Sequence, residues 1–429
     1  MSAEFNSGLN MARSYYVATA NRFASSPKLE GDLTADVVVI GGGYTGLHAA
    51  LNARARGFSV ILLEAGRIGW GASGRNGGQM IPGWRKGGAE LVRTFGQAKA
   101  KQLFDLALEA RTATLNAITE HNIECDLCTN GHLTLAAKRA DLAWMREETE
   151  TLERVMNYPN ARVLSAAEAR AQVDVPGAHG GLLDAYGGHL HPLNYALGLA
   201  EAARKAGVEL YENSKVIALA TSNGVLAQLA AGSVRATYGV LACDALLGGL
   251  EAVIARRIMP VANYLIATAP LPLAHKLISD NLAVSDSRFV VNYFRLSADR
   301  RLIFGGGERY SPEPPADISA FARAHMVKTF PQLHDAKIDY AWGGLVSITM
   351  SRLPHIGRLG DLFFAHGYSG QGVLLPALVG KVVSEAMTQT AERFDVLASI
   401  APPEFPGGAA LRSPLYVLGM LWYALRDRL

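Results

Sequence analysis

Two apolar runs on either side of a helical stretch form the clearest pattern of hydrophobic and polar positions in the chain. Val37 to Ile40 is a short, continuous apolar run, typical of a strand buried on both faces of a parallel sheet. A helical stretch over 44–56 ends at Gly57, and residues 58–63 form the second apolar run, with Glu64 directly after it. This order predicts a strand–helix–strand unit with an acidic side chain at its far end.

Three glycines with the spacing GxGxxG lie between the first strand and the helix, at Gly41, Gly43 and Gly46. They permit a tight turn and let amide N–H groups at the start of the helix approach a pyrophosphate. Glu64 can accept hydrogen bonds from a ribose. A glycine-rich turn in an ordinary α/β protein is the alternative, but the complete strand–helix–strand–acid order favours a dinucleotide site.

Two further glycine-rich segments favour a flavin over a nicotinamide. Residues 68–80, IGWGASGRNGGQM, cannot form a regular helix or strand cheaply, but their backbone can run close to a large flat ligand. Far along the chain, HGYSGQG (366–372) joins an apolar strand at 362–365 to an apolar helix at about 373–387. The positive end of that second helix can stabilise charge on the pyrimidine side of a reduced flavin.

Composition narrows the class of protein. At 429 residues and 49% hydrophobic, the chain has material for about two to three domains, and a net charge of +3 gives no reason to expect a nucleic-acid partner. We expect no secretory signal and no transmembrane segment. Three cysteines fit a reducing cytoplasm. No metal is expected, because the Cys125–Cys128 pair lacks a second pair and His189 and His191 lack a third ligand.

The order GGGYTG, ASGRNGGQ and GYSGQG resembles the FAD-dependent amine and amino-acid oxidoreductases of the D-amino-acid-oxidase type. SYYVATAN (14–21), GGHLHPLN (187–194) and KTFPQL (328–333) resemble more closely the γ-glutamylputrescine oxidoreductase branch of polyamine breakdown. Later segments such as PVANYLIATA alternate like the strands of an antiparallel sheet. The expected fold is therefore α/β: a Rossmann-like FAD-binding domain and a second, α+β substrate domain built on a mainly antiparallel sheet. The expected divisions are an N-terminal arm (1–34), a discontinuous FAD-binding domain (35–84, 161–250 and 346–400), a substrate domain (85–160 and 251–345) and a C-terminal tail with an apolar helix (401–429).

The resemblance places FAD along the three glycine-rich segments and near Val216. Relatives that attach FAD covalently use a late cysteine or a histidine in the early glycine-rich segment, and this chain has neither there, so we expect non-covalent FAD. RLIFGGG (301–307) lacks the lysine that speeds reaction with oxygen in sarcosine-oxidase relatives, so the electron acceptor is left open between oxygen and a redox partner. The predicted cofactor-binding residues are Gly41, Gly43, Tyr44, Thr45, Gly46, Glu64, Ala65, Ser73, Gly74, Arg75, Asn76, Gly77, Gly78, Gln79, Val216, Gly367, Tyr368, Ser369, Gly370, Gln371, Gly372 and Val373.

The resemblance implies an amine substrate that passes hydride to flavin N5, giving an imine that hydrolyses to an aldehyde. An apolar, aromatic pocket favours the neutral amine, so no side-chain base is obligatory. The candidate pocket residues are Tyr264, Tyr293, Tyr368 and Arg352, with Arg295 a further candidate for a substrate carboxylate. The expected substrate is γ-glutamylputrescine or a related γ-glutamylated amine. The alternatives are an imino-acid or N-methyl amino-acid oxidase or dehydrogenase, for example on L-pipecolate, and a flavin carrier without turnover.

Overall fold

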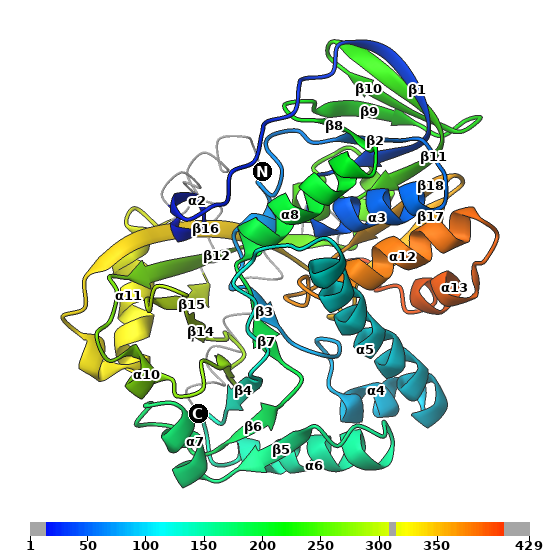
Figure 1. Cartoon of the computed structure of the whole chain (residues 1–429). Coiled ribbons are helices and arrows are strands. Elements are labelled where there is room, and N and C mark those ends of the chain that lie inside the picture. Colours follow the sequence, from blue (N-terminus) through cyan, green and yellow to red (C-terminus); the bar gives the residue numbers. More distant parts are fainter. Residues whose placement is uncertain (1–13, 309–314, 407–429) are drawn as a thin grey trace.

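The computed structural model describes residues 14–308 and 315–406, so the helix expected in the C-terminal tail lies outside the described residues. Two large sheets dominate the described chain, each with helices packed against it (Figure 1). A two-stranded ribbon, β3 (Gln79–Met80) with β7 (Gly188–His189), runs between them. Among these residues every helix is too short or too polar to cross a bilayer.

The first sheet is the predicted Rossmann-like unit, extended on both sides. Its strands follow the order β17–β18–β11–β1–β2–β8, parallel except for β17, and β10 and β9 continue from β11 in antiparallel fashion. The strands are β1 (Gly31–Ile40), β2 (Val60–Leu63), β8 (Glu209–Tyr211), β9 (Val216–Ala220), β10 (Val225–Leu229), β11 (Gly232–Leu241), β17 (His355–Leu359) and β18 (Leu362–His366).

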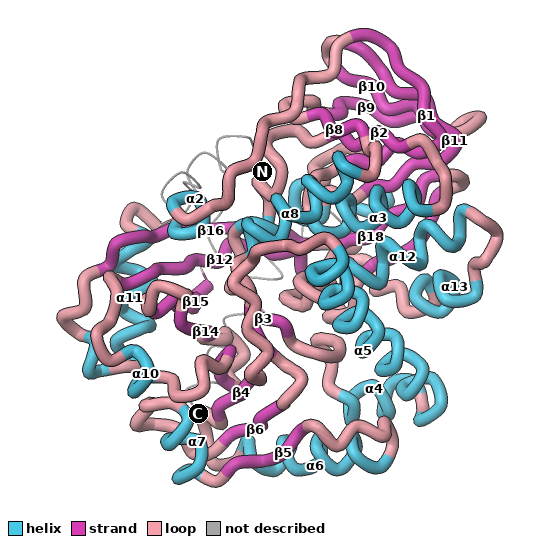
Figure 2. Tube along the Cα trace, viewed as in Figure 1, coloured by secondary structure: helices cyan, strands magenta, loops and turns pink. Residues whose placement is uncertain are grey.

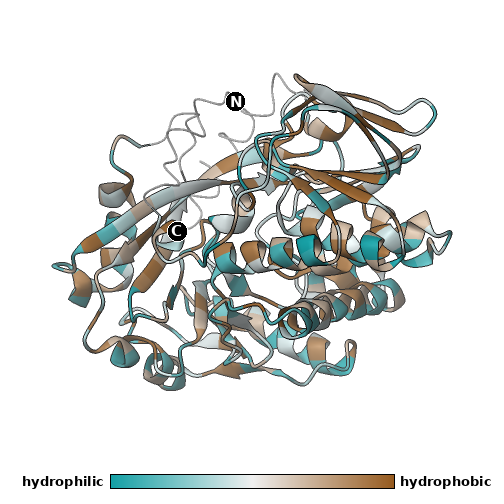
Figure 3. Cartoon of the chain, turned by 45° about the horizontal axis from the view of Figure 1, so that its top comes forward, coloured by the Kyte–Doolittle hydropathy of each residue, from teal (hydrophilic) through white to brown (hydrophobic). Residues whose placement is uncertain are grey.

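Continuous apolar runs form the central strands because both faces of this sheet are covered. Val37 and Val39 pack on the side of helices α3 (Tyr44–Ala55), α8 (Pro192–Lys205) and α12 (Leu375–Met387), whereas Val38 and Ile40 pack on the opposite side against β9 and β10. Figure 3 shows stretches of hydrophobic residues along strands of this sheet. The apolar run at the end of β1 is therefore continuous because this part of the strand is buried on both faces.

The second sheet is mainly antiparallel, as predicted, so the expected fold class is confirmed. Its order is β16–β12–β15–β14–β13–β4–β6–β5, and only the β13–β4 pair is parallel within the described chain. Figure 2 shows how these strands curve around one side of the molecule. The strands are β4 (His132–Leu135), β5 (Ala161–Leu164), β6 (Gly181–Asp184), β12 (Met259–Thr268), β13 (Ala283–Asp286), β14 (Tyr293–Leu296), β15 (Leu302–Glu308) and β16 (Ile338–Ile348).

Two segments pack with a different part of the fold from the one that the expected domain divisions give. Strands β5 and β6 belong to the second sheet, although residues 161–250 were assigned to the FAD-binding domain. Helices α4 and α5 share the apolar cluster of α3 and α12, although residues 85–160 were assigned to the substrate domain. The periodicity of apolar residues predicts a helix, but it does not show which sheet or helix layer the apolar face will pack against. The remaining helices are α2 (Tyr15–Ala18), α4 (Gly88–Phe95), α5 (Gln97–Glu120), α6 (Asp141–Arg154), α7 (Ala166–Gln172), α9 (Ala252–Ala255), α10 (Ala274–Leu277), α11 (Ile318–Thr329) and α13 (Glu392–Ala398).

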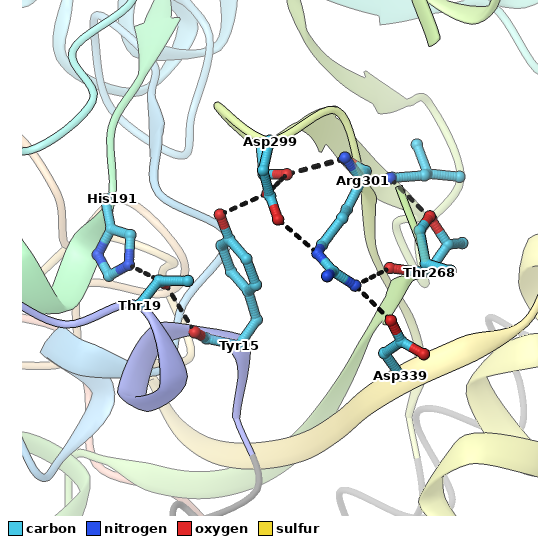
Figure 4. Close-up of polar contacts among 10 residues, drawn as sticks. Tyr15, Thr19, His191, Thr268, Asp299, Arg301 and Asp339 are labelled. Atoms are coloured by element: carbon cyan, nitrogen blue, oxygen red, sulfur yellow. Dashed lines mark hydrogen bonds and ion pairs between the residues drawn. The ribbon is translucent and has the colours of Figure 1, made fainter. Parts of the chain in front are cut away.

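The N-terminal arm is tied to the second sheet by polar contacts (Figure 4). Tyr15 OH donates to Asp299 Oδ1 at 2.8 Å, and Asp299 also pairs with Arg301. On the other side of α2, Thr19 Oγ1 lies 3.0 Å from His191 Nε2. Asp299 and Arg301 lie in the turn just before β15, and Tyr15 and Tyr16 pack against Leu265, Ile303 and Trp342, so the arm is fixed against that sheet.

Six histidines are buried, and burial lowers the pKa of each. His366 is fully buried at the end of β18, and neither ring nitrogen has a hydrogen-bond partner within the described structure. Burial, and then the neighbouring His355, lowers the pKa of His366 to about 3 from its usual 6.5. The others with lowered pKa values are His48, His132, His189, His191 and His355.

Replacing His366 by leucine should make the free energy of unfolding less sensitive to acid. In the native sequence the unfolded chain binds a proton below about pH 6.5 that the folded chain does not bind until the pH falls much further. The stability is thus full above about pH 6.5 and falls towards the folded-state pKa, by up to about 1.4 kcal/mol per pH unit for this group. Urea unfolding between about pH 7.5 and 5, with the expected cofactor in fixed excess, measures the slope. His334→Leu, at an exposed position, is the control. Equal slopes in the native and His366→Leu proteins would contradict this account.

Candidate functional site

The carboxyl ends of the central parallel strands open into a cavity of about 1170 Å³. This exceeds the roughly 300–1,000 Å³ of most small-molecule pockets, so the cavity suits a large ligand. In proteins with open parallel sheets, ligands bind in the crevice beyond the carboxyl ends of the strands, and this cavity lies at that place. Fifteen of the predicted cofactor-binding residues line it: Gly41, Gly43, Tyr44, Thr45, Glu64, Ala65, Ser73, Arg75, Asn76, Val216, Tyr368, Ser369, Gly370, Gly372 and Val373.

The first glycine turn is shaped by close backbone contacts. Gly41 has φ +114°, and a Cβ there would lie 2.6 Å from Ala242 O. A Cβ at Gly46 would overlap Gly41 O, and this explains why Gly46 is needed although it does not itself line the cavity. The turn therefore brings the start of α3 against the strand end, where Gly43, Tyr44 and Thr45 line the cavity.

Glu64 closes the same turn from the end of β2. Gly42 N–H donates to Glu64 Oε2 and Gly66 N–H donates to Glu64 Oε1, both at 2.7 Å. Burial raises the pKa of the Glu64 carboxyl, and the two amides oppose that shift. Each oxygen has a second lone pair that can accept a ribose hydroxyl. Glu64 thus both orders the turn and presents acceptors to the cavity.

Replacing Glu64 by alanine should weaken FAD binding by about 1.5–3 kcal/mol, the typical contribution of a hydrogen bond to a charged group. The variant loses the predicted ribose acceptor and also the anchor for the Gly42 and Gly66 amides. Glu64→Gln, which keeps one oxygen acceptor, should bind FAD with intermediate affinity. Fluorescence titration of FAD into the apoprotein measures both affinities, and an unchanged affinity in Glu64→Ala would show that the ribose is held elsewhere.

The second glycine turn is joined to the first by side chains. Tyr368 is buried, and its OH lies 2.8 Å from Thr45 Oγ1 at the start of α3. Burial raises the Tyr368 pKa, so its hydroxyl stays protonated at neutral pH. Gly367 has φ +73°, and its N–H donates to Asp244 Oδ1 at 2.9 Å.

Asp244 is a cavity residue that the sequence analysis missed. It begins the short 3-10 turn Asp244–Leu246 after β11, has φ +44°, and burial raises the pKa of its carboxyl. The available signal was its position: it lies three residues beyond the end of an apolar strand that pairs in parallel with β1, and such strand ends share one edge of a sheet. The structure also brings Ser214, Trp70 and the Gly344–Ser347 stretch of β16 to the cavity wall.

Arg75 connects the early glycine-rich segment to the second sheet. Its Nε donates to Trp70 O at 2.7 Å and its Nη1 donates to Gly343 O at 3.0 Å. Nη2 is buried without a partner in the described structure, and desolvation lowers the Arg75 pKa to about 10. Arg75 lines the cavity, so this donor is available to an acceptor on a bound ligand.

Seven predicted cofactor-binding residues do not line the cavity. Two of them make hydrogen bonds within the protein instead: Gly78 N–H donates to Asn76 Oδ1 at 2.7 Å, and Gln79 Nε2 donates to Val284 O of β13 at 2.8 Å. Their part in binding the cofactor stays a prediction. The seven are Gly46, Gly74, Gly77, Gly78, Gln79, Gly367 and Gln371.

The four predicted pocket residues are not brought together. Tyr368 lines the cavity, whereas Tyr293 lies over Gly77 and Gly305 and donates from its OH to Asn263 Oδ1. Tyr264 packs edge-on against Phe321 of α11, with ring centroids 5.4 Å apart, so the geometry lends its substrate role no support.

The two candidate arginines for a substrate carboxylate differ sharply. Arg352 is half-buried at φ +62°, with its guanidinium 5.2 Å from the Phe289 ring centroid and no hydrogen bond from it to any described residue. Arg295 is 2% exposed and its donors are engaged by backbone carbonyls. Arg352 therefore has donors that no described residue engages, but it does not line the cavity, and its substrate role stays a prediction; Arg295 is not available to a substrate carboxylate.

The donor set favours a dinucleotide over a metal. In the part of the chain that the structure describes, no three His, Cys, Asp or Glu side chains form a set of metal ligands. His189 Nε2 contacts Asn281 O, and His191 Nδ1 caps α8 by accepting from Asn194 N. The glycine cradle, the Glu64 acceptors and the unpartnered Arg75 donor fit the pyrophosphate, ribose and heteroaromatic parts of FAD.

Comparison with known proteins agrees with this fit. The family described as FAD dependent oxidoreductase (DAO) matches residues 36–386. The chain is 40% identical over 420 residues to γ-glutamylputrescine oxidoreductase of Escherichia coli (strain K12), covering 97% of this chain and 98% of that protein. It is 37% identical over 426 residues to the probable oxidoreductase OrdL of Rhizobium meliloti (strain 1021), covering 99% of each.

Solved structures show the same fold. Glycine oxidase from Geobacillus kaustophilus superposes with a TM-score of 0.75 at 22% identity, over 86% of this chain and 99% of that one. L-Proline dehydrogenase from P. horikoshii gives a TM-score of 0.71 at 20% identity, over 86% and 96%. The predicted cofactor, FAD, and the predicted enzyme class are thereby confirmed. This chain belongs to the FAD-dependent oxidoreductase family of the D-amino-acid-oxidase type, and it is an FAD-dependent amine or amino-acid oxidoreductase.

Proposed function

We propose that this enzyme oxidises the free primary amine of γ-glutamylputrescine, or of a closely related γ-glutamylated amine, in polyamine breakdown. The observation that carries the proposal is the full-length similarity, at 40% identity, to a protein named for oxidoreduction of γ-glutamylputrescine. The imine product hydrolyses to an aldehyde. FAD, held non-covalently, supplies a hydride acceptor when it is bound.

The chain's own residues bind and orient rather than exchange protons. The cavity wall carries Tyr368 and Trp70 beside the glycine turns, and Tyr293 lies over the Gly77 backbone. Apolar and aromatic surroundings disfavour an ammonium ion, so the amine binds as the neutral form that can lose hydride. The raised pKa of Tyr368 keeps it a hydrogen-bond donor rather than a base. This arrangement requires no side-chain base.

Arg352 is the residue we propose for the γ-glutamyl carboxylate. Its guanidinium is stacked on Phe289 and makes no hydrogen bond to any described residue, so its planar fork of donors is free. A contact at this remote end of the substrate positions the amine and so contributes to the rate as well as to binding. Free putrescine lacks the γ-glutamyl carboxylate and carries a second ammonium group that is costly to desolvate.

Three further aspects belong to the proposal. FAD is non-covalent, which the absence of a late cysteine and the absence of a histidine from the early glycine-rich segment support. The electron acceptor is oxygen or a redox partner, and the lysine-free RLIFGGG strand favours the partner. A cytoplasmic location is supported by three cysteines that are all free thiols.

The test is the rate of flavin bleaching without oxygen, measured across a concentration series of γ-glutamylputrescine, putrescine and L-pipecolate. We expect γ-glutamylputrescine to reduce the flavin fastest. If L-pipecolate is faster, the imino-acid alternative replaces the proposed substrate while the enzyme class stands. If no member of a wider panel of γ-glutamyl amines, imino acids and N-methyl amino acids bleaches the flavin, the carrier alternative replaces catalysis.

A further inference from the structure

Arg295 of β14 is a buried positive charge without an acidic partner. It is 2% exposed, and no ion pair in the described chain includes it. Its Nε donates to Gly77 O at 2.7 Å, its Nη2 to Leu190 O at 2.9 Å and its Nη1 to Leu296 O at 3.1 Å. A buried charge compensated only by carbonyl dipoles is costly. Stability alone gives no reason for a charged side chain here.

Two of the carbonyls that Arg295 holds belong to the early glycine-rich segment and to the backbone beside it. Gly77 O lies in that segment, two residues after the cavity-lining Arg75. Leu190 follows β7 and is joined to the segment, because Leu190 N–H donates to Gly78 O at 2.9 Å. Gly78 has φ +72°, and a Cβ there would overlap Leu190 O. One guanidinium thus fixes two backbones that approach too closely for any side chain to lie between them.

The N-terminal arm closes the other side of Arg295. Tyr16 of α2 is fully buried, its OH is 3.4 Å from Arg295 Nη2, and the Arg295 guanidinium lies 6.0 Å from its ring centroid. Tyr16 also packs edge-on against Trp342, whose Nε1 donates to Arg75 O at 3.0 Å. Arg295 and Trp342 each donate a hydrogen bond to this segment, and Tyr16 contacts both of them. Tyr15 and Thr19 fasten the same arm through other contacts (Figure 4).

The other titratable groups near Arg295 do not neutralise it. Burial, and after it the Arg295 charge, lowers the pKa of both His189 and His191 to about 3, so both rings are neutral. Burial raises the pKa of Tyr16, so its hydroxyl stays protonated. The guanidinium charge is therefore uncompensated by side chains, in a water-poor region where electrostatic interactions act over longer distances than in water.

We propose that Arg295 is a positioning residue that fixes the Arg75–Gly78 backbone for FAD and that its charge raises the midpoint potential of the bound cofactor. The inference rests on the proposed use of this segment in FAD binding. The fork of donors orders the segment before FAD binds, which lowers the cost of binding. The positive charge favours the more negative, reduced form of the cofactor over the oxidised form.

Three single variants of the full chain separate the two roles of Arg295. Arg295→Met removes both fork and charge, Arg295→Lys keeps the charge but cannot hold Gly77 O and Leu190 O with one planar group, and Tyr15→Phe removes an arm contact to Asp299 that does not reach Arg295. The measurements are the FAD dissociation constant and the midpoint potential, obtained by chemical reduction against a reference dye.

For Arg295→Met we expect FAD binding to be at least tenfold weaker. The preference for the reduced form should fall at least tenfold, which corresponds to a midpoint potential lower by about 30 mV for a two-electron couple. Arg295→Lys should bind FAD at least tenfold more weakly but keep the native potential. Tyr15→Phe should change neither quantity.

Native FAD affinity and potential in Arg295→Met would overturn the inference, as would equal changes in Tyr15→Phe. If the methionine variant does not fold, native FAD affinity in Arg295→Lys overturns the positioning role, and a lowered potential in Arg295→Lys overturns the charge role. Chemical reduction needs no amine. A failure of the proposed substrate would therefore show in the bleaching assay and leave these results intact.

Discussion

Replacing Gly46 by alanine should abolish FAD binding. A Cβ at this position would overlap Gly41 O, a backbone atom of the turn that faces the cavity. The overlap cannot be relieved by a rotamer change, because the backbone fixes the position of a Cβ and Gly41 O is itself a backbone atom. Relief requires α3 to move away from β1, which displaces the amide N–H groups at the helix start from the pyrophosphate position. The measurements are the flavin-to-protein absorbance ratio of the purified protein and FAD titration of the apoprotein.

Gly177→Ala is the matched control, because no heavy atom lies within 4 Å of a Cβ at that glycine. It should retain native FAD content and thermal stability. Native FAD content in Gly46→Ala would show that the turn tolerates a side chain, and the structural reason for the GxGxxG spacing would then be wrong.

Replacing Arg352 by methionine should lower kcat/KM for γ-glutamylputrescine by about 10- to 100-fold, while kcat/KM for putrescine should change little. A charge-assisted hydrogen bond contributes about 1.5–3 kcal/mol, and about 1.4 kcal/mol corresponds to a factor of ten. Arg352→Lys should lose less, since it keeps the charge but not the planar fork. The rates of anaerobic flavin reduction with both amines provide the measurement.

Arg300→Met is the control for this substitution, because Arg300 also has a positive φ, +64°, but is exposed at the turn before β15. It should leave both rates unchanged. An equal loss with γ-glutamylputrescine and putrescine in Arg352→Met would mean that Arg352 supports the fold of the 349–353 turn and does not recognise the glutamyl group.

Local spacing predicted the parts of the site that are built from one stretch of chain. Gly41, Gly46 and Glu64 belong to a single strand–helix–strand unit, and the structure puts them at one end of β1 and β2 because the unit has only one compact arrangement. The expected second glycine turn meets the first through Thr45 and Tyr368. The central strands are buried on both faces, and this explains why continuous apolar runs in the sequence predicted them.

Positions set by packing between distant segments could not be predicted in the same way. Arg295 was considered for a carboxylate from its residue type, but the strand buries it against Gly77 and Leu190. Asp244 depends on the meeting of two strand ends that are far apart in the sequence. Likewise, the patterns of α5 and β5 gave no information about which sheet or helix layer they would join.

The most direct test of the central claim is a single-turnover reduction of the FAD-loaded enzyme, without oxygen, by γ-glutamylputrescine deuterated at the carbon that bears the free amine. At saturating substrate we predict that flavin reduction is several-fold slower than with the undeuterated compound and that one aldehyde forms per flavin reduced. Deuterium at the carbon next to the amide should have no effect. Flavin reduction that is slowed only by deuterium at the amide-side carbon, or no flavin reduction at all, would contradict the account.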